Sequence, residues 1–209
     1  MDASNGGDWR RAATRIVVAT SNPGKVREIR EILSQYTRAL VVPVDAGRVS
    51  FPAEGDDYQV NAIGKARAVA AQLGAISIGD DSGLEVDALD GRPGVHSARY
   101  GGEGLDDAGR VDLLLRELSG VPIGSRTARF VCHAALATPR GDCIVARGVC
   151  RGVILEAARG AGGFGYDPVF QLAGRRETMA ELTAAEKNRA SHRADALRLL
   201  FSGDAARVE

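Results

Sequence analysis

The sequence contains no run of apolar residues long enough to cross a membrane. A spanning helix needs about 20 consecutive apolar residues, and no stretch of this chain approaches that length. Residues 1–14 also lack the apolar centre of a secretory signal peptide. These two absences predict a cytoplasmic protein without a membrane partner.

An excess of one charge and a disulfide framework are absent too. Lys plus Arg and Asp plus Glu each total 27, so the formal net charge is zero. No overall basic field therefore favours binding to nucleic acid or to an anionic membrane. The three cysteines, Cys132, Cys143 and Cys150, show no C-x-x-C spacing and lie in apolar stretches. This pattern predicts buried, reduced thiols.

The length of 209 residues fits one domain that buries a sizeable core without disulfides. No internal repeat or linker divides the chain. The opening segment is polar and glycine-rich, so we expect residues 1–14 to form a disordered extension. Residues 15–202 are expected to form the single domain.

Short β-branched runs alternate with helical patterns in the first part of the chain. Residues 15–20 predict a strand that leads into a helix at Pro23, with Asn22 as its N-cap. A second helix is expected over residues 57–73, ended by Gly74.

The next segment predicts two strands, residues 76–79 and 84–89, with polar residues at the end of the first. A helix over 106–118, a hairpin of strands 127–138 and 143–155, and helical sequence to about residue 201 follow. Together these elements predict an α/β domain with a mixed central sheet and flanking helices.

Four segments carry residues suited to chemistry, and the first lies at the start of the first helix. Small polar residues and a lysine at a helix N-terminus form a site that attracts phosphate. The P-loop spacing is absent, so an ordinary capped turn explains this segment about equally well. Its residues are Thr20, Ser21, Asn22, Pro23, Gly24 and Lys25.

The second segment is Asp80-Asp81-Ser82-Gly83, with two adjacent carboxylates after a strand that reads as buried. Holding two carboxylates there is costly unless they meet a cation. Magnesium suits them, because it prefers oxygen ligands and takes only one or two carboxylates beside water and phosphate. A turn with solvated carboxylates is the alternative.

The third segment is the glycine-rich loop of residues 162–168. Its glycines let backbone N–H groups approach a ligand closely, and Phe164 offers a ring on which a flat base can stack. The alternative is a tight connection that buries the ring in the core.

The fourth segment runs from Thr183 to Arg193. Thr183 and Glu186 have the spacing of a capping box. In one straight helix Lys187 and His192 would point about 140° apart and could not share a ligand. We therefore predict a break near residues 188–191, with Ser191 capping a final helix; a continuous helix with a solvated charged face is the alternative.

Taken in order, these motifs resemble the inosine/xanthosine triphosphate pyrophosphatases. The resemblance covers residues 16–200 and implies two lobes around a substrate cleft, a homodimer, and Mg²⁺ as cofactor. It also implies hydrolysis of the triphosphates of inosine and xanthosine, with ribose or deoxyribose, to monophosphate and pyrophosphate, which cleanses the nucleotide pool. The motifs are residues 20–25, 61–66, 80–84, 93–100, 162–168 and 180–193.

The resemblance also implies residue roles. Asp81 is expected to be the proton acceptor and a metal ligand, with Glu54 on the metal side and Asp80 as a further candidate ligand. The segment around Glu54 is one residue shorter than in the family, and Val60 stands where a Glu is frequent. Asp56 or Asp57 are therefore alternatives to Glu54 as the metal ligand. Expected at the substrate are Thr20, Ser21, Asn22, Pro23, Gly24, Lys25, Ser82, Phe164, Gly165, Tyr166, Asp167, Lys187, His192 and Arg193.

The predicted reaction is in-line attack of water on the α-phosphorus, with Asp81 as general base. Lys25, Lys65 and the helix N-terminus would neutralise the charge that grows on pyrophosphate. Two other hypotheses remain at this stage: a phosphohydrolase that releases orthophosphate, and a module that binds nucleotides without turnover.

Overall fold

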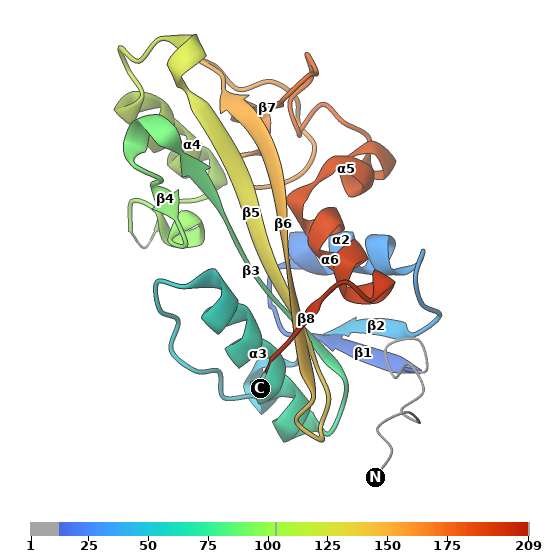
Figure 1. The fold of residues 1–209 in the computed structure, drawn as a ribbon. Helices are drawn as coiled ribbons and strands as arrows, with labels where there is room; N and C mark the ends of the chain where they lie inside the picture. Colours follow the sequence, from blue (N-terminus) through green and yellow to red (C-terminus); the bar gives the residue numbers. More distant parts are fainter. Residues whose placement is uncertain (1–12, 103, 209) are drawn as a thin grey trace.

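The computed structural model describes residues 13–102 and 104–208, and the predicted extension of residues 1–14 falls almost entirely outside them. Among these residues the chain forms an eight-stranded mixed sheet in the order β2-β1-β3-β5-β6-β7, with β4 beside β3 and β8 beside β6. Three long strands run through the molecule and join its two ends (Figure 1). They are β3 (Ser77–Val86), β5 (Thr127–Ala137) and β6 (Cys143–Ile154).

A parallel unit builds one end of the sheet; its first strand was predicted from the sequence, and its second, β2, was not. Strands β1 (Arg15–Val18) and β2 (Leu40–Pro43) lie parallel, and β1 also pairs with the start of β3. Helix α2 (Pro23–Leu33) connects them, and its N-cap Asn22 accepts a hydrogen bond from the Lys25 backbone N–H at 3.0 Å. The predicted start of this helix is confirmed.

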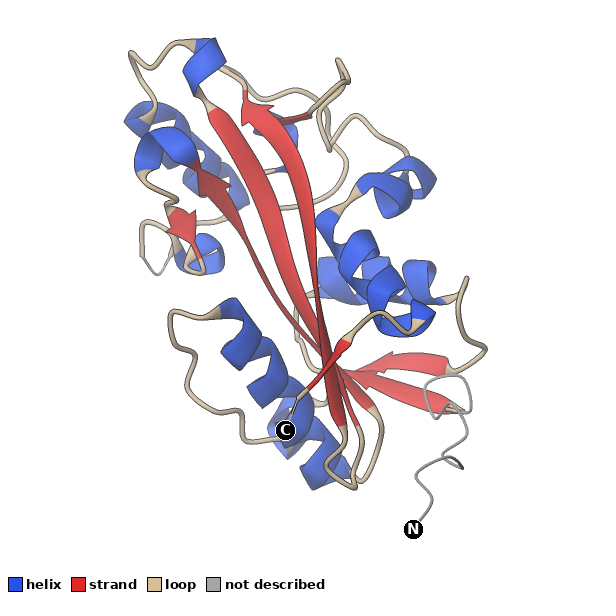
Figure 2. Ribbon diagram, viewed as in Figure 1, coloured by secondary structure: helices blue, strands red, loops and turns tan. Residues whose placement is uncertain are grey.

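Helices cover both faces of the sheet at this end (Figure 2). Helix α3 (Tyr58–Leu73) packs on one face, while α2 and α6 (His192–Ser202) pack on the other. Two glycines allow this close approach, because a Cβ at Gly79 of β3 would lie 2.1 Å from the Ala62 carbonyl of α3. A Cβ at Gly148 of β6 would lie 2.0 Å from the His192 carbonyl of α6.

The other end of the long strands has its own core, in which Leu84, Leu114 and Phe170 are fully buried. Among the described residues, apolar clusters thus lie toward both ends of the long strands, which fits the expected two lobes. The remaining elements are α4 (Asp107–Glu117), α5 (Ala184–Ala190), β4 (Pro93–Gly94), β7 (Phe170–Leu172), β8 (Ala206–Arg207) and the 3-10 helices Ala46–Arg48, Asp87–Leu89, Ser97–Arg99, Ile123–Ser125 and Asp167–Val169.

The prediction of two strands over residues 76–79 and 84–89 is wrong. One continuous strand, β3, spans Ser77–Val86, and residues 87–89 form a 3-10 helix. Asp80 and Asp81 therefore lie in the middle of a strand rather than at its end. The strand can continue across both residues because cations from other elements form ion pairs with each carboxylate.

The predicted break before the last helix is confirmed. Thr183 and Glu186 form the capping box of α5, which ends at Ala190. Ser191 then caps α6, its hydroxyl accepting a hydrogen bond from the Ala194 N–H at 3.2 Å. The three cysteines are buried and unpaired, as predicted.

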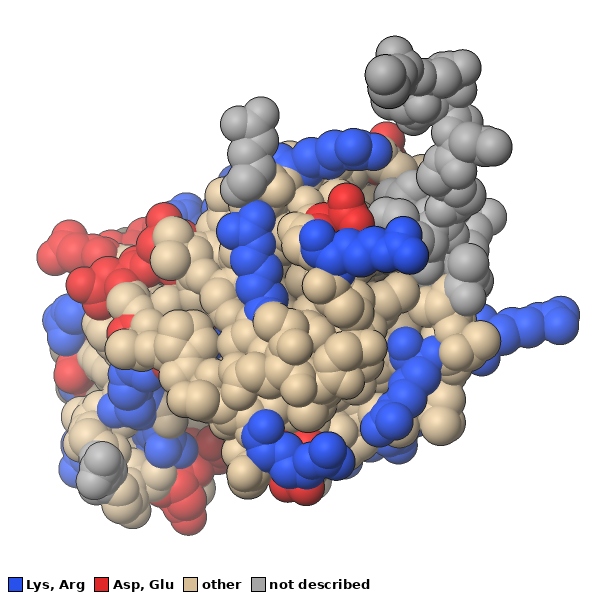
Figure 3. All heavy atoms as spheres, turned by 90° about the horizontal axis from the view of Figure 1, so that it is seen from below, with Lys and Arg blue, Asp and Glu red and all other residues tan. Residues whose placement is uncertain are grey.

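Two further observations agree with the composition. Among the described residues no helix is both long and apolar enough to span a bilayer. Seen from below, Lys, Arg, Asp and Glu lie scattered around a broad area of other residues (Figure 3). That face carries no continuous basic surface, in line with the zero net charge.

Candidate functional site

Alternation along β3 divides the predicted site between two faces of the sheet. Successive strand side chains point to opposite faces, so Asp80 and Ser82 point toward α2 and α6 while Asp81 points toward α3. Each face carries a polar cluster. We call them the arginine cluster (Lys25, Glu28, Asp80, Ser82, Asp167, Lys187, Arg193) and the carboxylate cluster (Glu54, Asn61, Lys65, Asp81, Arg99).

Arg193 organises the arginine cluster from the first turn of α6. Its Nε donates to Asp80 Oδ2 at 2.8 Å, its Nη1 bonds Glu28 of α2, and its Nη2 donates to Ser82 Oγ at 3.0 Å. Lys25 Nζ lies 2.5 Å from Asp80 Oδ1. Asp80 is thus fully occupied by protein cations, and Cys132 Sγ donates to its Oδ2 at 3.1 Å as well.

Lys187 ties the same cluster to the glycine-rich loop. Its ammonium lies 2.6 Å from Glu28 Oε1 and bonds the Asp167 carboxylate, which also accepts the Phe164 backbone N–H at 2.9 Å. The Phe164 ring lies 4.9 Å below Lys187 Nζ. The ring also meets Gly24, where a Cβ would lie 2.6 Å from Phe164 Cδ1. The predicted aromatic ring therefore contacts the start of α2 and lies near two cations, Lys187 and Arg193, whose Cζ is 5.8 Å from the ring centroid.

The carboxylate cluster lies between α3 and β3. Lys65 Nζ lies 2.5 Å from Glu54 Oε1 and 2.7 Å from Asp81 Oδ1, so one ammonium bridges both carboxylates. Asn61 Nδ2 donates to Asp81 Oδ2 at 3.0 Å, and Arg99 Nη1 lies 2.6 Å from Glu54 Oε2. Glu54, despite the shortened segment around it, is thereby placed beside Asp81.

The alternative metal ligands Asp56 and Asp57 lie elsewhere. Asp57 caps α3 by accepting the Gln59 and Val60 backbone N–H groups, and Asp56 is exposed near His96. The bridging ammonium shows that Glu54 and Asp81 together accommodate a positive charge. Carboxylate oxygens are also the ligands that Mg²⁺ prefers. Within the described residues no group of three or more His, Cys, Asp and Glu side chains gathers for metal binding.

The charges of the two clusters shift several pKa values. Burial opposes ionisation of Asp80, but Arg193 and Lys25 outweigh it and hold its pKa well below the usual value. The pKa of Glu28 is lowered because Arg193 and Lys187 likewise overcome its burial. For Glu54, burial is outweighed by hydrogen bonds from Lys65 and Arg99, which lower its pKa to about 2. Burial raises the pKa of Asp167, although Lys187 opposes that rise.

These shifts predict a loss of stability in acid. A carboxyl group whose pKa is lower in the folded protein stabilises the fold above its unfolded pKa and loses this contribution as pH falls through the folded value. For Glu54 that interval runs from 4.5 to about 2. The free energy of unfolding, measured in urea, should therefore fall across this interval, and more shallowly in Glu54→Gln. The raised pKa of Asp167 has the opposite effect on stability, but it is one group against three with lowered pKa values in the two clusters, Asp80, Glu28 and Glu54. A profile without acid loss would contradict the assigned pairing.

The remaining predicted residues take different positions. Thr20, Ser21 and Asn22 form the turn before α2, where Thr20 Oγ1 accepts the Asn22 N–H at 3.2 Å, and Pro23 is the exposed first residue of the helix. Tyr166 is buried and donates to the Ser97 carbonyl at 2.9 Å, so its hydroxyl is already engaged.

Gly165 donates its N–H to Asp107 of α4 at 2.7 Å. His192 stacks on Phe130, with 4.9 Å between ring centroids, and its buried Nδ1 has no hydrogen-bond partner within the described structure. Burial and the neighbouring Arg193 hold the pKa of His192 well below its usual value, so the ring is neutral.

Sequence reasoning missed three residues of these clusters as site residues. Glu28 joins Lys187 to Arg193, Asn61 orients Asp81, and Arg99 holds Glu54. A signal for Glu28 was present, because a charged residue among the inward positions of an amphipathic helix is costly without a partner. Arg99 and Asn61 lie in motifs of the resemblance, but their spacing alone gives no contact.

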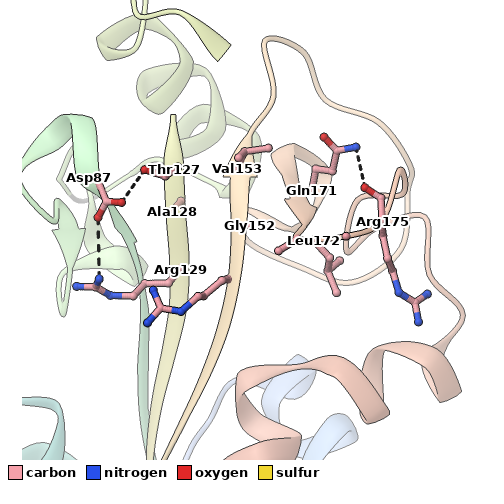
Figure 4. A pocket seen from close by; sticks show the side chains of 12 residues that line it. Asp87, Thr127, Ala128, Arg129, Gly152, Val153, Gln171, Leu172 and Arg175 are labelled. Atoms are coloured by element: carbon pink, nitrogen blue, oxygen red, sulfur yellow. Dashed lines mark hydrogen bonds and ion pairs between the residues drawn. The ribbon is translucent and has the colours of Figure 1, made fainter. Parts of the chain in front are cut away.

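A cavity of about 500 Å³ lies elsewhere, at the far end of β5 and β6 (Figure 4). It is lined by residues that include Asp87, Arg129, Gln171 and Arg175, and by none of the predicted site residues. The predicted polar side chains instead fill the space between their elements by bonding one another. We therefore place the site by its chemistry rather than by this cavity.

Comparison with known proteins agrees with the resemblance. The sequence model of the Ham1 family matches residues 16–202. A Geobacillus kaustophilus protein named dITP/XTP pyrophosphatase is 51% identical over 185 residues, which cover 87% of this chain and 90% of the relative. One of the same name from Bacillus cereus is 47% identical over 189 residues, 89% of this chain and 92% of the relative. The solved structure of a HAM1 protein from Coxiella burnetii is 38% identical, with a TM-score of 0.79 over 90% of this chain and 97% of that chain.

Proposed function

The chain belongs to the Ham1 family, and from this membership and the geometry of the two clusters we propose that it hydrolyses the triphosphates of inosine and xanthosine, in ribose or deoxyribose form, to monophosphate and pyrophosphate. The names of the relatives at 47 to 51% identity support this substrate class. The observation that carries the proposal is the position of Phe164, whose ring lies against Gly24 at the phosphate-attracting start of α2. A base on that ring would place its phosphates toward β3.

The base would be held by stacking and by donors. Phe164 supplies the ring, and the loop N–H groups with Lys187, His192 and Arg193 supply hydrogen-bond donors for a 6-keto oxygen. Adenine presents an amino donor at that position, so seating it would leave buried donors unpaired. The buried Nδ1 of His192 has no partner among the described residues, so it is available for a polar contact with a ligand.

The phosphates would be held by Lys25, Lys65, Ser82 and the N-terminus of α2. Lys25 and Lys65 lie on opposite faces of β3, bonded to Asp80 and Asp81 respectively. The two positive charges therefore lie on opposite faces of β3, beside the neighbouring residues Asp80 and Asp81. Mg²⁺ bound by Glu54 and Asp81 would supply charge neutralisation at the phosphates.

Hydrolysis would proceed through water held by Asp81. We propose that its carboxylate takes the proton as the water oxygen attacks the α-phosphorus in line with the departing pyrophosphate. Asn61 fixes the orientation of this carboxylate through its 3.0 Å hydrogen bond. The growing charge on pyrophosphate would be balanced by Lys25 and Lys65.

A methyl group at position 24 tests the role of Phe164. Gly24→Ala places a Cβ where the ring now lies, 2.6 Å from Cδ1, so the ring must shift. We expect KM for inosine triphosphate to rise about tenfold with little change in kcat, because the lost stacking is worth about 1–3 kcal/mol. Steady-state kinetics measure this. The matched control is Gly124→Ala, where a Cβ meets no atom within 4 Å; an unchanged KM in Gly24→Ala would argue against the stacking assignment.

Product analysis tests the proposed function itself. The pure protein is incubated with Mg²⁺ and, separately, with the triphosphates of inosine, xanthosine, guanosine and adenosine. We expect monophosphate and pyrophosphate from the first two and much slower turnover of adenosine triphosphate. Orthophosphate as the first product would favour a phosphohydrolase, and no turnover of any triphosphate would favour a binding module.

We also propose a cytoplasmic homodimer that takes no nucleic acid or membrane as partner. The proposal of a dimer is based on the family resemblance. The proposal that nucleic acid is not a partner is based on the scattered surface charges. Light scattering after size-exclusion chromatography measures the mass directly, and a mass near 21.9 kDa, that of one chain, would contradict the dimer.

A further inference from the structure

The ammonium of Lys65 stands where two carboxylates converge. It lies 2.5 Å from Glu54 Oε1 and 2.7 Å from Asp81 Oδ1, and its side chain is only 15% exposed. Mg²⁺ binds carboxylate oxygens at about 2.0–2.1 Å. An ammonium and a divalent ion cannot share these two oxygens, because both would occupy the same small space and repel each other.

The outer oxygens of the same carboxylates are held by other residues. Arg99 lies 2.6 Å from Glu54 Oε2, and Asn61 donates to Asp81 Oδ2 at 3.0 Å. Neither bond depends on Lys65. If the ammonium moves away, Arg99 and Asn61 still aim the two inner oxygens at the position it leaves. The cluster thus has a fixed pair of oxygens and a cation on a flexible four-carbon stem.

The charges of the cluster are balanced. Glu54 and Asp81 carry two negative charges, and Lys65 and Arg99 carry two positive charges. A divalent ion alone would leave an excess of two positive charges in a half-buried site, which is unfavourable. A triphosphate brings about four negative charges and offers the Lys65 ammonium new oxygen partners. Lys65 can then leave the carboxylates without losing its ion pairs.

From this geometry we propose that Lys65 and the divalent cation compete for one position between Glu54 and Asp81, so that the cation binds with the triphosphate and only weakly before it. The inference rests on the proposed function and adds an order of binding to it. Lys65 would act as a built-in counter-ion for the two carboxylates and would pass to the phosphates when nucleotide arrives. It would also keep the free protein from holding a metal ion.

Direct titration with Mn²⁺ in the absence of nucleotide tests this competition. Free Mn²⁺ is counted by electron paramagnetic resonance. We expect weak binding to the wild-type protein and binding tighter by about tenfold or more in Lys65→Met, because a positive charge a few ångströms away is removed. Lys65→Arg, which keeps the charge, should bind as weakly as the wild type. The control Arg116→Met removes one positive charge from α4 and should leave Mn²⁺ binding unchanged.

Two further variants make the outcome decisive. Lys65→Gln, which keeps one donor for the carboxylates, should also bind Mn²⁺ more tightly than the wild type. Adding Glu54→Gln to Lys65→Met should remove the gain, which assigns the bound ion to this pair. Mn²⁺ affinity equal to that of the wild type in both Lys65→Met and Lys65→Gln would overturn the proposal. Because no nucleotide is present, the titration gives its answer even if product analysis refutes the proposed function.

Discussion

Replacing Asp81 by Asn is expected to lower kcat for inosine triphosphate by about a thousandfold, the range in which a positioned general base acts. The carboxylate lies mid-strand on β3, where Asn61 Nδ2 and Lys65 Nζ approach one oxygen each, at 3.0 and 2.7 Å. An amide keeps only one acceptor, so it cannot receive both donors. It also cannot take a proton from water. Steady-state kinetics with pyrophosphate detection measure the loss.

The matched control for this variant is Asp87→Asn. Asp87 follows the end of the same strand, and its exposed carboxylate accepts a hydrogen bond from Thr127 at 2.6 Å. It lies outside both clusters, so turnover should stay within about twofold of the wild type, as for a surface substitution. An Asp81→Asn variant that folds and retains more than a tenth of wild-type kcat would show that another group activates the water.

Arg193→Met is expected to lower the free energy of unfolding by about 3–5 kcal/mol, the cost of removing one partner from a buried ion pair. The guanidinium is 2% exposed and bonds Asp80, Glu28 and Ser82 at once. Its removal leaves Glu28 with Lys187 alone and Asp80 with Lys25 as its one remaining cation. Urea unfolding at pH 7, followed by circular dichroism, measures the change.

Arg198→Met is the matched control on the same helix. Its side chain is 53% exposed and pairs with Asp195 in an (i, i+3) arrangement, which contributes about 0–1 kcal/mol. A loss in Arg193→Met no larger than in this control would show that the buried network adds no stability. In that case the arginine cluster would serve ligand binding alone.

The features that could be predicted from the sequence are those set by neighbouring residues. Asn22 before Pro23 and the Thr183–Glu186 spacing specify helix starts through contacts within one turn, and both predictions are confirmed. The break at Ser191 was predicted from helix geometry, because Lys187 and His192 could not share a ligand on one straight helix, and it is confirmed as well. The two capping signals act within three residues and need no knowledge of the fold.

The features that could not be predicted depend on residues far apart in the chain. Asp80 and Asp81 read as the end of a strand because two adjacent carboxylates are costly inside a sheet. Arg193, 113 residues later, meets the first of them, and Lys65 on α3 meets the second. No residue near position 80 in the sequence indicates that Arg193 or Lys65 will pair with these carboxylates. The continuous strand, and with it the separation of the site into two clusters on opposite faces, therefore had to come from the structure.

The central claim is that water held by Asp81 attacks the α-phosphorus, and isotope labelling tests it most directly. Inosine triphosphate is hydrolysed in water enriched in ¹⁸O, and the monophosphate and pyrophosphate are separated and weighed by mass spectrometry. The account predicts one ¹⁸O atom in the monophosphate and none in the pyrophosphate. Label in pyrophosphate, or in orthophosphate, would mean that water attacks a different phosphorus and would contradict the proposed mechanism.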